Sequence, residues 1–321
     1  MSFTKDRLKR IAAPLLIFWP VVIAAFTALA IWGFIVSHGG VIPEDAPPPP
    51  KMTLETFPLT HLWFLYVLLI FYILMLAGRK LIAVTDRRHW LSDGTDMILR
   101  GASKLPILPF LLALPTAWAL NSLEVWYPFF GVPTPDFGFI PNFPSLIAYG
   151  TAFSLGWVLH RQAGLLQKIA RAWPLYLITA IGLTTYCLFT IGTTLRYDQF
   201  LTGSTKTIYA LAYSVAIWAW SFGLIGAALY FMSGYSPLRR YIADASYWLY
   251  LIHLPIVMAL QIWMSQWTLA AELKYVLILA LSIPLMLFSY HYLVRFSFIG
   301  ALLNGRKRQK QKPAVMGETI R

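Results

Sequence analysis

Charged residues are scarce in this chain of 321 residues, and their scarcity excludes a soluble globular protein. Asp, Glu, Lys and Arg make up 12% of the sequence, whereas hydrophobic residues make up 58%. A soluble domain carries about twice that charged fraction. The composition therefore predicts a protein that crosses a lipid membrane several times.

Cysteine is almost absent. Cys187 is the single cysteine, and it lies inside an apolar run. One thiol cannot form an intramolecular disulfide and cannot build a cysteine metal cluster. We therefore expect no bound metal, and we interpret Cys187 as a packing residue.

Several motifs of soluble enzymes are missing as well. The sequence holds no P-loop, no glycine-rich dinucleotide-binding pattern, no His-Glu-x-x-His and no Gly-x-Ser-x-Gly. These absences argue against nucleotide hydrolysis, zinc proteolysis and ordinary serine hydrolase chemistry. We expect no bound cofactor.

Positive charge is in excess, and its position predicts the topology. Lys and Arg number 26 against 13 Asp and Glu, which gives a net charge of +13. Such an excess suggests nucleic acid for a soluble protein, but in a membrane protein it marks the cytoplasmic loops, so we expect no nucleic-acid partner. Eight apolar segments are expected to be transmembrane helices: 11–37, 61–77, 106–120, 144–160, 173–195, 207–234, 246–264 and 275–294.

With both termini in the cytoplasm, 22 of the 26 Lys and Arg residues fall on the cytoplasmic side. This is the asymmetry that membrane insertion favours. The predicted fold is an all-α polytopic membrane protein with about eight transmembrane helices, surrounded by membrane lipid.

His61 stands at a sharp boundary between a proline-rich polar linker and an apolar run. It is expected at the outer surface of the membrane, beside Trp63. Histidine at this position is a functional candidate. An aromatic belt that anchors the helix in the headgroup region is the structural alternative.

His253 is expected about two turns into the helix 246–264, deeper than His61 and across from it. Tyr250 is three residues earlier and shares its face of the helix. Pro255 has no N–H, so it frees the carbonyl of Leu251 from its usual partner. A polar surface that joins neighbouring helices is the alternative to a functional role.

Three motifs, in this order, resemble the integral-membrane acyltransferase 3 family. Arg7 and Arg10, followed by Pro14, resemble its Arg-x-x-Arg-x-x-x-Pro entry to the third helix. The run 61–65, His-Leu-Trp-Phe-Leu, resembles its His-x-Trp-Phe-Leu motif and is most similar to the branch that includes glucan biosynthesis protein C. The run 246–255, Ser-Tyr-Trp-Leu-Tyr-Leu-Ile-His-Leu-Pro, resembles a late-helix motif.

The resemblance implies transfer of an acetyl or succinyl group from cytoplasmic acyl-CoA to a hydroxyl of an extracytoplasmic carbohydrate. The acceptor is expected to be a periplasmic glucan or a surface polysaccharide, and the location is expected to be a bacterial inner membrane. His61, His253 and Tyr250 are the expected catalytic residues, with an imidazole taking or orienting the proton of a sugar hydroxyl.

The same resemblance implies two binding regions. Arg7 and Arg10 are expected to hold the phosphates of acyl-CoA, although orienting the helix by positive charge is an alternative role. The acceptor is expected to contact aromatic faces, for which interfacial anchoring is the alternative; these residues are Trp63, Trp126 and Tyr127.

The chain also departs from the family. Its members typically have about ten helices, and their first helix carries an Arg and a His. Met1 falls just before the segment that resembles the third helix, so we expect the membrane domain, residues 1–298, to be N-terminally incomplete. Residues 299–321 are expected to form a basic, disordered cytoplasmic tail.

Two other functions are compatible with this reading of the sequence. One is a catalytically inactive remnant that scaffolds glycan synthesis. The other is a transporter or flippase, with helices interrupted by prolines as the substrate path.

The charge asymmetry makes the topology testable. Single cysteines at Thr53 and Thr134, placed in a Cys187→Ala background, should react with a membrane-impermeant maleimide in intact cells. A cysteine at Ser92 should react only after the membrane is permeabilised. Labelling in the opposite pattern would contradict the predicted orientation.

Overall fold

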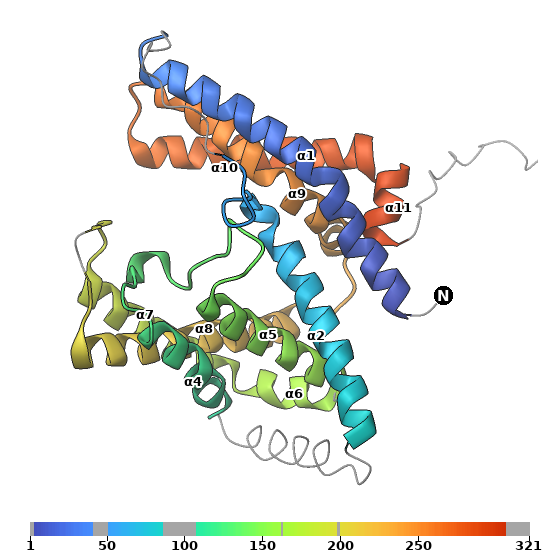
Figure 1. Cartoon of the computed structure of the whole chain (residues 1–321), viewed down its shortest axis with the longest axis vertical. Helices are drawn as coiled ribbons and strands as arrows, with labels where there is room; N and C mark the ends of the chain where they lie inside the picture. Colours follow the sequence, from blue (N-terminus) through green and yellow to red (C-terminus); the bar gives the residue numbers. More distant parts are fainter. Residues whose placement is uncertain (1–2, 41–50, 86–106, 162, 198–199, 306–321) are drawn as a thin grey trace, which may run out of the picture. The chain divides into compact units, whose positions relative to one another are not determined.

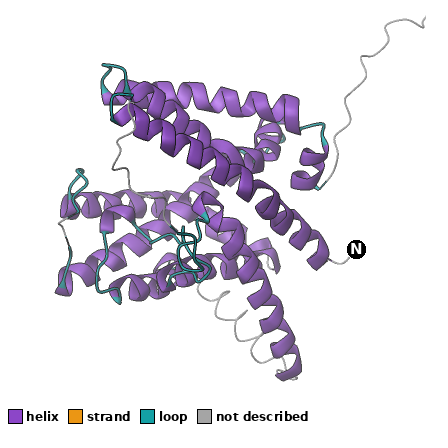
Figure 2. Cartoon of the chain, turned by 45° about the horizontal axis from the view of Figure 1, so that its top comes forward, coloured by secondary structure: helices purple, strands orange, loops and turns teal. Residues whose placement is uncertain are grey.

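The computed structural model describes residues 3–40, 51–85, 107–161, 163–197 and 200–305. Every regular element in these ranges is a helix (Figure 2). The α-helices are α1 (Phe3–Ser37), α2 (Trp63–Thr85), α4 (Leu108–Asn121), α5 (Phe143–Arg161), α6 (Ala163–Arg171), α7 (Trp173–Ile191), α8 (Gly203–Phe231), α9 (Pro237–Ser265), α10 (Ala271–Ser289) and α11 (Phe298–Asn304). The prediction of an all-α fold is confirmed.

Six segments within the described ranges are long and apolar enough to cross a membrane. They are Leu8–Ser37, Thr60–Ile82, Trp173–Ile191, Gly203–Phe231, Pro237–Ser265 and Ala271–Val294. The other two expected segments are also helical, as α4 and α5, but α4 has only 14 residues and α5 includes several small and polar residues. The structure therefore supports a polytopic membrane protein. The basic loop expected after α2 lies mostly at 86–106, outside the described residues.

The chain forms two compact units, each described by itself. Unit 1 comprises residues 1–69 and 236–321, and unit 2 comprises residues 70–235. The prediction had treated residues 1–298 as one membrane domain.

In unit 1, α1 and α9 pack side by side (Figure 1). The hydroxyl of Tyr247 donates to the carbonyl oxygen of Arg10 at 2.8 Å, and Gly33 lies against Ile262 further along both helices. The two helices therefore run in the same direction. Helix α10 packs on α9, where Trp248 Nε1 donates to the hydroxyl of Ser289 at 2.9 Å.

Pro14 lies inside α1 rather than in its first turn, because the helix begins at Phe3. Proline has no N–H, so the carbonyl of Arg10, four residues earlier, loses its helical donor. The hydroxyl of Tyr247 replaces that donor. A neighbouring side chain that satisfies the freed carbonyl explains how an apolar helix tolerates this proline.

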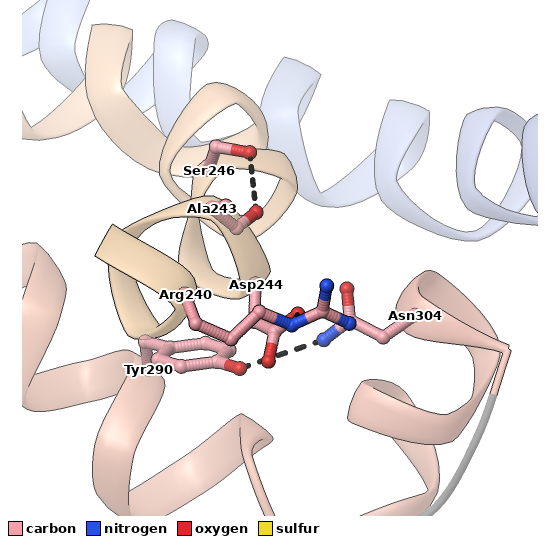
Figure 3. Close-up of polar contacts among 6 residues, drawn as sticks. All are labelled: Arg240, Ala243, Asp244, Ser246, Tyr290 and Asn304. Carbon is pink, nitrogen blue, oxygen red and sulfur yellow. Dashed lines mark hydrogen bonds and ion pairs between the residues drawn. The ribbon is translucent and has the colours of Figure 1, made fainter. Parts of the chain in front are cut away.

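The end of α10 is a π-helical turn, Tyr290–Val294, which is followed by α11. A Cβ at Gly300 would collide with the carbonyl oxygen of Val294, so α11 packs tightly on that turn. Figure 3 shows Asn304 of α11 donating to the hydroxyl of Tyr290 at 3.5 Å, beside the Arg240–Asp244 ion pair of 3.4 Å. Packed structure therefore extends past the predicted boundary at 298, and residues 306–321 lie outside the described residues.

Unit 2 is organised around α8, which is more buried than the other long helices. In the most apolar window of α8, 56% of the residues are buried, against 22% or less in the other five segments. Side chains of α8 form a core with α4, α5 and α7; its buried members are Leu108, Ala113, Leu155, Tyr176, Val215, Trp218 and Phe222.

Close approach of α8 to its neighbours depends on glycine. A Cβ at Gly226 would lie 2.5 Å from Cβ of Trp173 and 2.8 Å from the carbonyl oxygen of Ala170. At Gly223, an added Cβ would lie 2.6 Å from a methyl carbon of Leu177. Small residues allow this kind of close helix packing in membranes.

Gly226→Val should therefore destabilise unit 2, because two of the nearest atoms belong to another backbone and to the stem of a tryptophan. We expect the unfolding free energy to fall by about 1–3 kcal/mol, the usual effect of overpacking. The matched control is Gly182→Val in α7, where an added Cβ meets nothing within 4 Å. Thermal unfolding of both variants in detergent measures the difference, and equal losses would show that the α8 contact is not the cause.

Candidate functional site

The segment before α2 enters unit 1 beside the middle of α1. The ring of Phe57 stacks on Trp19, with centroids 4.6 Å apart and an interplanar angle of 14°. Trp19 Nε1 also donates to the carbonyl oxygen of Pro58 at 2.8 Å. At a rise of about 1.5 Å per residue, Trp19 is roughly 27 Å from the end of α1 at Ser37. The segment before α2 therefore contacts the middle of α1 and not its C-terminal end.

A residue with strained backbone directly precedes His61. Thr60 has a φ of +51°, a left-handed conformation that a β-branched residue rarely adopts. It begins a short 3₁₀ turn, Thr60–Leu62, that leads directly into α2. The strain is held by packing, because Leu59 and Leu62 are only 2% and 0% exposed. Strained backbone of this kind is common at functional sites.

His61 is held by the backbone of α9. Its Nε2 lies 3.2 Å from the carbonyl oxygen of Leu251. That carbonyl lacks its usual helical donor because Pro255 stands four residues later. A carbonyl oxygen can only accept, so Nε2 of His61 carries the hydrogen, and the lone pair of the neutral ring lies on Nδ1.

The Nδ1 atom of His61 is buried and has no hydrogen-bond partner among the described residues. Leaving a buried polar atom unpaired costs about 1–3 kcal/mol. Such an atom in a folded protein calls for an explanation, and a catalytic role is one of those known. The lone pair on Nδ1 can accept a hydrogen bond or a proton from a bound group.

His253 lies beside His61, and the two ring centroids are 5.2 Å apart at an interplanar angle of 85°. Nδ1 of His253 is 2.7 Å from the carbonyl oxygen of Tyr250 and therefore carries the hydrogen. The two histidines thus form one cluster, and their depth in the membrane stays a prediction.

The position of His253 along its helix needs correction. Helix α9 begins at Pro237, not near Ser246, so His253 is more than four turns from its start. It is roughly 18 Å from the end of α9 at Ser265. The cluster therefore lies within the length of the α1–α9 pair, rather than at one end.

Tyr250 joins α9 to the first turn of α2. Its hydroxyl donates to the carbonyl oxygen of His61 at 2.6 Å and accepts from the backbone N–H of Leu65. Leu65 is the residue whose N–H that carbonyl would accept in a continuous α-helix. The tyrosine therefore fixes the backbone that carries His61.

The other predicted site residues are more widely distributed. The indole of Trp63 lies next to Phe64, with centroids 6.0 Å apart. Arg7 lies in α1, and its side chain is outside the described residues. The guanidinium of Arg10 lies against Gly305, at the end of α11. None of these positions tests the predicted binding roles.

Trp126 and Tyr127 belong to unit 2 and differ in exposure. Trp126 is only 4% exposed, packs against Tyr209 and Tyr213, and donates its Nε1 hydrogen to the carbonyl of Gly131 at 2.7 Å. Packing in unit 2 accounts for its position, which the sequence did not indicate. Tyr127 is 38% exposed. Acceptor binding by either residue stays a prediction.

Sequence reasoning missed three participants in the cluster. Phe26 places its ring 5.9 Å from that of His61, Trp19 anchors Pro58, and Thr60 supplies the strained turn. The sequence could have indicated Trp19, because an indole N–H within an apolar run needs a buried acceptor. It could not have indicated Phe26 or Thr60, since Phe and Thr are ordinary residues in such a sequence.

The role of Tyr250 in holding the turn can be measured against a neighbouring tyrosine. Tyr250→Phe removes two hydrogen bonds at the start of α2, whereas Tyr247→Phe removes the one hydrogen bond to Arg10 described above. We expect Tyr250→Phe to lower the unfolding free energy by about 1–3 kcal/mol. The loss should exceed that of Tyr247→Phe in thermal unfolding, and the reverse order would contradict the assignment.

Comparison with known proteins gives one result. The sequence model of the Acyl_transf_3 family, described as an acyltransferase domain, matches residues 1–291. No curated protein and no solved structure matches the chain. The matched range includes His61, Tyr250 and His253, and it covers most of the 321 residues. This protein belongs to the acyltransferase 3 family of membrane acyltransferases.

Proposed function

We propose that this protein transfers an acetyl or succinyl group from cytoplasmic acyl-CoA to a hydroxyl of an extracytoplasmic carbohydrate. The acceptor is a periplasmic glucan, as in the glucan biosynthesis protein C branch, or a surface polysaccharide, and the membrane is a bacterial inner membrane. Membership of the family supports acyl transfer in general.

The observation that carries the proposal is the unpartnered Nδ1 of His61. Its lone pair is buried, and Nε2 is fixed on the carbonyl of Leu251. An acceptor hydroxyl at Nδ1 would supply the missing hydrogen-bond partner. The same contact orients the hydroxyl for general base catalysis.

The proposed reaction is direct transfer. Nδ1 of His61 takes the proton of the acceptor hydroxyl while the hydroxyl oxygen forms a bond to the thioester carbonyl carbon. The carbon–sulfur bond then breaks, and CoA leaves as a thiolate. The thiolate takes up the proton, which returns His61 to its neutral state.

The depth of the cluster supports transfer between the two sides of the membrane. His61 contacts Phe26 of α1 and Leu251 of α9, both well inside helices long enough to span a bilayer. A donor from one side and an acceptor from the other each have part of the distance to cover. A base at one surface would require one substrate to cross completely.

His253 and Tyr250 are proposed to support the base. The ring of His253 lies against His61, and Tyr250 holds the His61 backbone. Arg7 and Arg10 are proposed to bind the phosphates of acyl-CoA through charge-assisted hydrogen bonds. Within unit 1, Trp63 is the proposed acceptor contact, and acceptor binding by Trp126 and Tyr127 of unit 2 stays a separate prediction.

Two substitutions at His61 separate catalysis from folding. Glutamine places an amide N–H near the position of Nε2, so His61→Gln keeps a donor for the Leu251 carbonyl but offers no base. His61→Ala loses both. We expect both variants to lower transfer from labelled acetyl-CoA or succinyl-CoA by about 10²- to 10⁴-fold, the usual contribution of a general base. His61→Gln should also keep a melting temperature close to that of the wild type.

The assay uses membranes that contain the full chain and a panel of glucan and polysaccharide acceptors. Thiol release reports donor use, and label in the carbohydrate reports transfer. Retained transfer in His61→Gln would exclude His61 as the base. Absence of transfer by the wild-type chain from either donor would contradict the proposed function.

A further inference from the structure

The carbonyl oxygen of Leu251 connects the shape of α9 to the chemistry of His61. In a continuous α-helix this oxygen would accept from the N–H of residue 255, which here is proline. The ring of a proline inside a helix also clashes with the carbonyl four residues earlier. Pro255 therefore removes the helical donor of the Leu251 carbonyl.

The carbonyl of Leu251 is not accessible to bulk water, because Leu251 is 0% exposed. His61 Nε2, at 3.2 Å, is the donor that this structure gives it in place of the missing N–H. Without that donor, the oxygen would carry the penalty of a buried unsatisfied acceptor, about 1–3 kcal/mol. The penalty favours the one neutral form of His61 that has its hydrogen on Nε2.

We propose that Pro255 is a positioning residue that selects the tautomer of His61. By withholding an N–H from the Leu251 carbonyl, it keeps the hydrogen of the imidazole on Nε2 and the lone pair on Nδ1. The catalytic consequence rests on the proposed function, in which Nδ1 is the base. The tautomer itself does not depend on that function.

Unit 1 shows the same physical arrangement a second time. Pro14 frees the carbonyl of Arg10, and the hydroxyl of Tyr247 takes it up at 2.8 Å. A hydroxyl can rotate to suit its acceptor and has no tautomer to choose. At Leu251 the replacement donor is an imidazole. The hydrogen bond that satisfies this carbonyl therefore also decides which ring nitrogen of His61 carries the lone pair.

The test is ¹⁵N NMR of histidine-labelled full chain in lipid nanodiscs. Protonated and unprotonated nitrogens of a neutral imidazole resonate in separate regions, and the signals of His61 are identified by their loss in His61→Gln. The wild type should show a protonated Nε2 and an unprotonated Nδ1. A wild-type His61 with its hydrogen on Nδ1 would overturn the proposal without any variant at Pro255.

Two replacements at position 255 distinguish the effect of the missing N–H from the effect of the rigid proline ring. Pro255→Ala restores the helical donor, so we expect the signal of unprotonated Nδ1 to lose intensity as the second tautomer appears. An α-hydroxy acid at 255, introduced during translation, forms an ester that has neither N–H nor ring, and it should keep the wild-type tautomer. Pro284→Ala in α10 is the matched control, and it should leave the His61 signals unchanged.

Unchanged His61 signals in Pro255→Ala would overturn the proposal, and so would loss of the wild-type tautomer in the ester variant. If Pro255→Ala does not fold, the wild type and the ester variant still decide the question. Transfer measured in parallel should fall several-fold in Pro255→Ala and remain above that of His61→Gln. No transfer in the wild type with the expected tautomer would reject the proposed function alone.

Discussion

A backbone carbonyl that loses its helical donor in apolar surroundings must find another, and two such carbonyls in unit 1 accept from side chains of a neighbouring element. Pro14 and Pro255 each leave one carbonyl of a long helix without its partner. The replacement donors are the hydroxyl of Tyr247 and Nε2 of His61. Each contact joins two elements, so satisfying the backbone also fixes α1 and the start of α2 against α9.

The position of the candidate site follows from these contacts. The chain before α2 is anchored on Trp19 through Pro58, and the hydroxyl of Tyr250 in α9 bonds to the backbone at the start of α2. Because both anchors lie in the interior of long helices, the turn that carries His61 is held at their level. The strained φ of Thr60 is then a local cost that several contacts maintain together.

The sequence predicted the helices well and the site only in part. Apolar runs indicate helices, and the absence of an N–H at Pro255 predicts a free carbonyl from sequence alone. The contact between His61 and His253 was not predictable, because hydropathy locates a segment along the chain and not beside its neighbours. The sequence does contain a signal for the start of α9, because Ser236 can cap the helix and Pro237 suits its first turn. The arginines that follow suggested a loop instead.

Aromatic residues in a proline-rich loop suggest a surface, which is why burial of Trp126 was missed.

The groups that orient the two histidines are carbonyl oxygens of α9, and this choice has a consequence for the chemistry. A carboxylate in the same place would stabilise a protonated ring more strongly, but it would have to lose its hydration, at several kcal/mol for an ion. A peptide carbonyl is uncharged and is already present in the helix. It fixes the ring and its tautomer while favouring the imidazolium less. In the proposed reaction the base must take a proton from a hydroxyl and release it to a thiolate within one turnover. An imidazole held by neutral groups meets both requirements, because its positive charge exists only between the two steps, when the negative charge of the reacting oxygen or of the departing thiolate lies beside it.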